Sequence, residues 1–237
     1  MKYVPAALIL LLSLSFALAP LVTSPFTGFT ADQLPNPQIN PPVQPAGYAF
    51  AIWGLIYLWL IASALFGVVK RPADPAWHRA RGPLIISLAI GTPWLAIANA
   101  SAIWATITIF LMAATAIAAL IHAPKSDRWF FAVPVGIYAG WLTAASFVSL
   151  GSTAAGYGVI TGQLGWAYLG IIGALIVAVP VYLRSRQPAY ALTVIWALVG
   201  IVIANASATL TVAALAAAGI VVLLALVLLR PAIAVPS

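Results

Sequence analysis

Aromatic side chains are the residues of this sequence best suited to recognise a ligand. Phe50, Trp53 and Tyr57 occupy positions i, i+3 and i+7 of an apolar stretch, so on a helix their rings form one stripe. Three prolines within residues 41–45 precede them, and they predict a stiff strap across the mouth of whatever the stripe faces. Aromatic residues also gather where a helix crosses a membrane surface, so an interfacial belt explains the stripe equally well.

A second set of aromatic residues lies deeper in apolar stretches. Tyr138 and Trp141 are three residues apart near the middle of one stretch, and Trp94 and Asn99 belong to another. An indole N–H in hydrocarbon needs a partner, which is a carbonyl of a neighbouring helix, a water-filled cleft or a ligand. Helix packing is the commoner answer, and Asn99 has two interpretations, a cap for the following turn or an amide for a ligand.

The groups that most enzymes use are scarce. The chain has no Glu and no Cys, and its three Asp residues all lie between the apolar stretches. Ion-coupled transporters normally place acidic or basic groups within the bilayer, so this class is disfavoured. His78 and His122 are candidates for a metal or haem-iron site, but ordinary surface histidines are the simpler interpretation. We therefore expect a protein that is not an enzyme and holds no metal.

Composition defines the elements that must position these residues. Hydrophobic residues make up 64% of the 237 and charged residues only 5%, as expected of a polytopic membrane protein. A bilayer core needs roughly 20 apolar residues per spanning helix. The sequence predicts an all-α transmembrane bundle of eight helices, at residues 4–23, 47–69, 83–99, 102–122, 131–150, 164–183, 189–205 and 208–229.

Charge placement predicts the orientation of these helices. All ten Lys and Arg residues lie at the two termini or on alternate connections, and the other four connections have none. By the positive-inside rule, both termini face the cytoplasm. The net charge of +7 is thus a signal of topology and of contact with the lipid bilayer, not of nucleic-acid binding.

Two segments near the N-terminus carry alternative interpretations. The first apolar run ends in Ala17-Leu18-Ala19, which imitates a signal-peptidase site. Pro20 directly after that site argues against cleavage, so we expect a retained first helix. Residues 24–46 form the longest connection without a basic residue. Their prolines favour a semi-rigid lid, and a linker without function is the alternative.

Two stretches resemble the TspO/MBR family, the tryptophan-rich sensory proteins related to the mitochondrial translocator protein. The first has Pro41-Pro42, Tyr48, Phe50 and the run from Trp53 to Tyr57, and the second has Pro134, Tyr138 and Trp141. Ile39-Asn40 stands where the family has a tryptophan before its double proline. The resemblance implies a TspO-like five-helix bundle in residues 1–150, with three additional transmembrane helices in residues 151–237, as in a longer bacterial branch.

The family's known properties supply the functional expectation. The resemblance implies a cavity beneath the first long loop that binds haem, porphyrin or another tetrapyrrole, or a sterol-like lipid, for sensing or transport, often in a homodimer. It implies a multi-pass protein of the bacterial inner membrane. The ligand-binding residues expected from spacing and resemblance together are Pro42, Tyr48, Phe50, Trp53, Tyr57, Trp94, Asn99, Tyr138 and Trp141.

Two other functions fit the same sequence. The apolar final helices and small-residue faces suit an accessory subunit of a larger membrane complex, for example a pigment-bearing photosynthetic assembly. Co-purification with a stoichiometric large complex would distinguish that role from ligand binding. The third candidate is a facilitative transporter of an uncharged solute, which liposome flux without ion coupling would identify.

Overall fold

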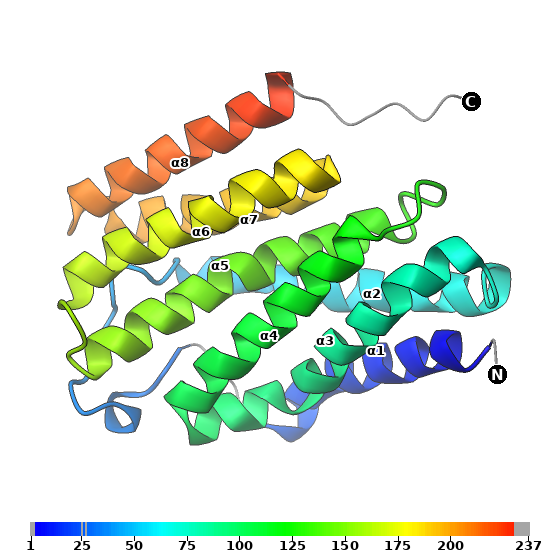
Figure 1. The fold of residues 1–237 in the computed structure, drawn as a ribbon. Coiled ribbons are helices and arrows are strands. Elements are labelled where there is room, and N and C mark those ends of the chain that lie inside the picture. Colours follow the sequence, from blue (N-terminus) through cyan, green and yellow to red (C-terminus); the bar gives the residue numbers. More distant parts are fainter. Residues whose placement is uncertain (1–2, 25, 27, 230–237) are drawn as a thin grey trace.

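Eight long apolar helices form the structure, a computed structural model that describes residues 3–24, 26 and 28–229. Each helix is long and apolar enough to cross a membrane, so the chain is a multi-pass membrane protein. No strand occurs in the described residues. The helices are α1 (Val4–Val22), α2 (Ile52–Lys70), α3 (Pro75–Ala100), α4 (Ala102–Ile121), α5 (Ala132–Gly156), α6 (Gln163–Ser185), α7 (Pro188–Asn205) and α8 (Leu210–Leu229) (Figure 1).

The helix ends follow local capping chemistry. The Asp74 side chain accepts hydrogen bonds from the first backbone N–H groups of α3, and Pro75 takes the first helical position. Ser101 does the same for α4 by accepting from Trp104 N. The third helix was expected to begin at residue 83, and this prediction is wrong by eight residues because the cap starts the helix before its apolar stretch.

The first five helices close into a ring. α1 packs against α2 and α3, α3 against α4, and α4 against α5, which also contacts α2. α6 and α7 pack on the other side of α5, and α8 covers them at the edge of the molecule (Figure 1). One continuous set of buried apolar side chains draws on all eight helices.

Small residues let α5 and α7 approach closely. A Cβ atom at Gly140 would lie 2.5 Å from the carbonyl oxygen of Tyr190, and one at Gly136 would lie 2.9 Å from the Gln187 side chain. The small residues of α5 at a four-residue spacing therefore form a helix contact inside one molecule.

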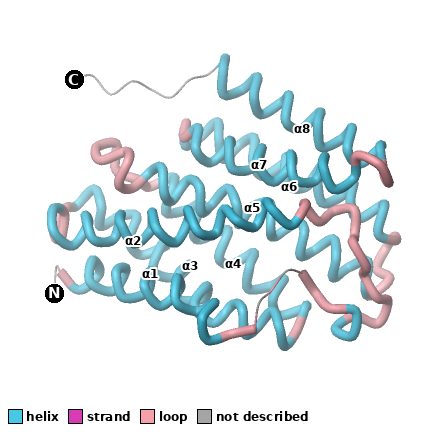
Figure 2. The backbone as a smooth tube through the Cα atoms, turned by 180° about the vertical axis from the view of Figure 1, so that it is seen from behind, coloured by secondary structure: helices cyan, strands magenta, loops and turns pink. Residues whose placement is uncertain are grey.

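The two ends of the bundle differ in chemistry. The basic end carries the connections α2–α3, α4–α5 and α6–α7, and eight of the ten Lys and Arg residues lie on these connections or at the helix ends that flank them. The opposite end, called the loop end here, carries the long connection between α1 and α2, seen as the pink tube that crosses the end of the bundle in Figure 2. A cavity behind this connection would therefore be closed by loop residues.

Hydrogen bonds attach this loop to three different helices. The Gln33 amide donates to the carbonyl of Ala98 in α3 at 2.8 Å. Asn36 N–H donates to the carbonyl of Gly156 in α5 at 2.8 Å, and Ala46 N–H donates to a carbonyl of α7 at 3.0 Å. A linker without function would not need such attachments, so the contacts favour the semi-rigid lid.

Candidate functional site

An apolar cavity of about 300 Å³ lies inside the ring of α1–α5, behind the long loop. Five of the nine expected binding residues line it, and they come from α2 with its preceding turn, from α3 and from α5: Phe50, Trp53, Tyr57, Trp94 and Trp141. No charged side chain is among the residues that line the cavity. Its chemistry is that of stacking and dispersion, with a few polar groups.

The aromatic rings contact one another around this cavity. Trp53 stacks on Tyr57 with ring centroids 5.4 Å apart and planes 20° apart. Trp141 meets Phe50 edge-on at 5.7 Å and Trp53 edge-on at 6.1 Å. The spacing of the α2 stripe thus places its rings together, and these contacts hold them at fixed angles to the space they enclose.

The indole of Trp141 stands apart from the other deep indoles. Trp94 and Trp196 each donate their N–H to a backbone carbonyl, at 3.1 and 2.9 Å. Trp141 is only 2% exposed, yet its N–H has no hydrogen-bond partner among the described residues. Burying such a donor without a partner costs about 1–3 kcal/mol. The cavity therefore has a donor suited to an acceptor atom of a ligand or to a water molecule.

The long loop forms the roof of the cavity. Phe26, Phe29, Gln44 and Pro45 line it from the loop side. The Phe26 ring lies edge-on to Phe29 at 5.5 Å and to Trp94 at 5.4 Å. These two phenylalanines are therefore the aromatic part of the roof.

Four expected residues do not line the cavity. The Pro42 carbonyl accepts a hydrogen bond from the Asn205 amide at 2.9 Å. Tyr48 lies half-exposed and edge-on to Trp196, with centroids 5.4 Å apart. Both therefore join the loop and the adjoining turn to α7.

The other two, Asn99 and Tyr138, have partners within the protein. Asn99 donates to the carbonyl of Ser24 at 3.1 Å and so fixes the start of the loop, whereas Ser101 caps the turn into α4. Tyr138 is fully buried, and its hydroxyl lies 2.9 Å from the Ser87 hydroxyl. Tyr138 supports the wall from behind, because its ring contacts Phe16, which lines the cavity.

Sequence reasoning missed several residues that line the cavity. Phe16 lies in the first helix, where the signal-like pattern hid its contribution. On α5, Ala144, Val148 and Ser152 follow an i, i+4, i+8 spacing and give the cavity its room. Their helical spacing after Trp141 was a usable signal.

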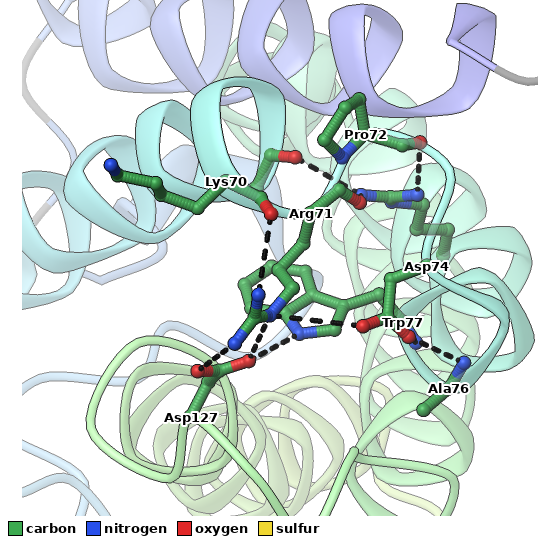
Figure 3. A network of polar contacts seen from close by, with 9 residues as sticks. Lys70, Arg71, Pro72, Asp74, Ala76, Trp77 and Asp127 are labelled. Carbon is green, nitrogen blue, oxygen red and sulfur yellow. Dashed lines mark hydrogen bonds and ion pairs between the residues drawn. The ribbon is translucent and has the colours of Figure 1, made fainter.

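A separate polar network lies at the basic end (Figure 3). Arg71 donates to both carboxylate oxygens of Asp127, at 2.7 and 3.1 Å, and Trp77 donates its indole N–H to Asp127 at 3.1 Å. The Arg71 guanidinium holds the pKa of Asp127 below its usual value. Trp77 is only 2% exposed, so its indole packs inside the protein at this end.

The network has a structural explanation. It ties the α2–α3 connection to the α4–α5 connection. Buried Arg81 donates to the carbonyls of Gly67, Arg71 and Pro72, which terminate α2. In the described part of the chain, no three His, Cys, Asp or Glu side chains are grouped to hold a metal ion.

Comparison with known proteins supplies the family. The family described as "TSPO-like protein" matches residues 5–229, a range that includes all eight helices. No curated protein and no solved structure matched the chain. The expected division at residue 150 stays a prediction, although the match continues beyond it. Since the match covers nearly the whole sequence, the chain belongs to the TSPO-like family.

Proposed function

We propose that the cavity binds a planar hydrophobic ligand, a tetrapyrrole or a sterol-like lipid, for sensing or transport and without chemical conversion. The observation that carries this proposal is the unpartnered indole N–H of Trp141 at a cavity walled by stacked rings. Flat apolar ligands gain from edge and face contacts with aromatic rings, and one donor is enough to orient them.

The absence of charged lining residues favours a particular orientation. A carboxylate transferred into this cavity without a cationic partner would lose much of its hydration energy. The acidic groups of a tetrapyrrole would therefore stay toward the loop end, in contact with water, while its ring system enters the cavity. A neutral sterol-like ligand has no such restriction.

The volume of the cavity makes the lid part of the binding event. About 300 Å³ is the lower end of the range of roughly 300–1,000 Å³ for small-molecule pockets. The helix walls belong to the packed core, so a larger ligand has to displace the roof. We expect Phe26 and Phe29 to move outward by more for a tetrapyrrole than for a narrower ligand.

The test is a titration of the purified protein with protoporphyrin and, separately, with a fluorescent sterol, reading the ligand signal. Trp141→Phe keeps an aromatic ring and removes the N–H. We expect it to weaken binding by about 2- to 10-fold, the effect of one hydrogen bond. Trp104→Phe is the matched control, because Trp104 is exposed and does not line the cavity.

Each outcome decides the proposal. Weaker binding in Trp141→Phe alone supports the assigned cavity, and the ligand that binds identifies the class. If wild-type protein bound neither ligand, the proposed function would be wrong. If both variants bound as tightly as wild type, the ligand would have to occupy another place.

We also propose that the basic end faces the cytoplasm of a bacterial inner membrane. The support is the distribution of Lys and Arg, all of which lie at the termini, on the three connections of that end or at the helix ends that flank those connections. Cytoplasmic enrichment of basic residues in short connections is the general rule for inserted helices.

A further inference from the structure

A second hollow opens on the outer surface of the bundle, between α2, α5 and α7, with a volume of about 590 Å³. Its floor is formed by Val133 and Ile137 of α5. Its sides are formed by α2 and α7, whose Leu55 and Leu192 are exposed. We call this hollow the α2–α7 groove. It faces the lipid and is separate from the internal cavity: no residue lines both.

Two contacts, one before α2 and one in its middle, border the groove. At the loop end, the turn before α2 is held to α7, because Trp196 donates its N–H to the Ala49 carbonyl at 2.9 Å. Toward the basic end, α2 turns to the start of α5 instead: Trp59 donates to the Trp129 carbonyl at 3.0 Å, and the two rings stack with planes 6° apart. From the loop end toward the basic end, α2 thus changes its neighbour from α7 to the start of α5. The space between α2 and α7 follows from this arrangement.

The polarity of the groove changes along its length. Arg128 is the single charged residue lining it and makes no ion pair with any described residue. The neighbouring Asp127 is already occupied by both nitrogens of Arg71. Gln187 also lines the groove and is 5% exposed, and its amide oxygen accepts from Ala189 N at 3.4 Å. Both groups belong to the basic end.

The other end of the groove is apolar. Ile52, Leu55 and Trp196 line it, and the Trp196 N–H is already bonded to a carbonyl. A ligand that matches this surface has an anionic, hydrogen-bond-accepting head beside Arg128 and Gln187 and an apolar tail that runs along α2 toward the loop end. This polarity matches a phospholipid whose head lies at the membrane surface nearest the basic end.

We propose that the α2–α7 groove binds one anionic phospholipid, with its phosphate at Arg128 and Gln187 and an acyl chain against Val133, Ile137 and Leu192. Guanidinium and amide donors suit phosphate oxygens. At ~30 Å³ for a water-sized group, 590 Å³ holds roughly 20 such groups, which is the scale of one acyl chain. The lipid fills the hollow between α2 and α7, so it also supports the position of α2.

The test is native mass spectrometry of the full chain after purification in mild detergent, with phosphatidylglycerol or phosphatidylcholine of the same acyl chains added. The expected result is one retained phosphatidylglycerol per chain, in preference to phosphatidylcholine. Arg128→Gln should reduce the affinity for phosphatidylglycerol about 5-fold, the effect of one basic group near a membrane surface. Arg79→Gln is the matched control, an exposed arginine of the same end that does not line the groove.

A second pair of variants tests the acyl-chain part. Leu192→Trp fills the groove and should abolish retention, whereas Leu58→Trp, on an exposed face of α2 outside the groove, should not. Far-UV circular dichroism checks that each variant is folded. The proposal is overturned if no lipid is retained, if retention survives Leu192→Trp, if Arg128→Gln binds both lipids as wild type does, or if the groove variants instead abolish a dimer.

Discussion

Tyr138 supports the cavity wall, and we expect that it does not touch a ligand. Its hydroxyl bonds to Ser87, which also donates to the Met112 carbonyl at 2.9 Å, and the whole ring is buried. We expect Tyr138→Phe to lower the free energy of unfolding by about 1 kcal/mol, the worth of one buried hydrogen bond. Binding of the ligand should stay within a factor of two.

Two measurements check this expectation. Denaturant unfolding in detergent, followed by circular dichroism, gives the stability change, and the ligand titration described above gives the affinity. A Tyr138→Phe protein of normal stability that loses ligand affinity would contradict the assignment and place the phenol in the cavity. Trp141→Phe serves as the comparison, because it should change affinity without removing any bond among the described residues.

Asp127 makes the stability of the folded protein depend on pH in the acid range. Because Arg71 lowers the pKa of Asp127, the folded state holds the carboxylate charged more strongly than the unfolded state, where the pKa is about 3.9. Its contribution to stability is complete above that value and is lost as pH falls through the lower folded pKa. We expect the thermal midpoint of the wild type to fall below about pH 4.

Asp127→Asn is the variant that checks the source of this effect. At pH 7 its thermal midpoint should be lower than that of the wild type. As the pH is lowered below 5, its thermal midpoint should fall by less than that of the wild type. Arg71→Gln is the matched change on the partner, and it should also make the thermal midpoint depend less on pH below 5. If the thermal midpoint of Asp127→Asn fell with pH as steeply as that of the wild type, another group would be responsible for the loss of stability in acid.

The sequence could not distinguish the deep tryptophans from one another. Trp94 and Trp141 both lie within apolar stretches with small neighbours. The Trp94 N–H is satisfied only because α4 brings the Ala105 carbonyl to 3.1 Å, a contact across a helix pair. The stripe of Phe50, Trp53 and Tyr57 was predictable because its spacing lies within one segment, whereas the partner of an indole depends on a second helix.

At the scale of single elements, the α5–α7 contact depends on the absence of a side chain at Gly140. A Cβ there would lie 2.5 Å from the Tyr190 carbonyl oxygen, and backbone cannot move aside as a flexible side chain can. We expect Gly140→Ala to destabilise the protein by about 1–3 kcal/mol through overpacking. Thermal unfolding in detergent measures the change.

Gly54→Ala in α2 is the matched control. No atom of a packing neighbour lies within 4 Å of a Cβ built at Gly54, and no proline follows it. Helical Gly→Ala changes of this kind normally stabilise by roughly 0.5–1 kcal/mol. The two variants should therefore shift stability in opposite directions, and a stabilised Gly140→Ala protein would show that α5 and α7 are not in close contact.

The helices themselves were largely predictable, because hydropathy and helix length are properties of contiguous segments. All eight predicted spans correspond to observed helices. The start of α3 was missed because Asp74 and Pro75 begin the helix in a polar stretch that lies before the apolar run. The burial of Trp77 in α3 could not be predicted for a related reason, since its partner Asp127 lies in the distant α4–α5 connection.

At the scale of the whole molecule, one packed core joins both groups of helices. Tyr190 of α7 and Tyr138 of α5 belong to the same buried cluster as Phe16 of α1. Sequence periodicity does not show which helices are neighbours, so the ring of five helices and the position of α6–α8 beside α5 required the structure. The cavity inside that ring follows from this arrangement and not from the α2 stripe alone.

The orientation of the molecule can be measured directly, because the chain contains no cysteine. Ala73→Cys introduces a thiol in an exposed position of the basic end, and Ser207→Cys introduces one at the loop end. With the basic end in the cytoplasm, a membrane-impermeant maleimide added to intact cells should label Ser207→Cys and leave Ala73→Cys unlabelled until the membrane is opened. The wild-type chain is the control for background labelling. The reverse pattern would place the long loop, and with it the entrance to the aromatic cavity, on the cytoplasmic side.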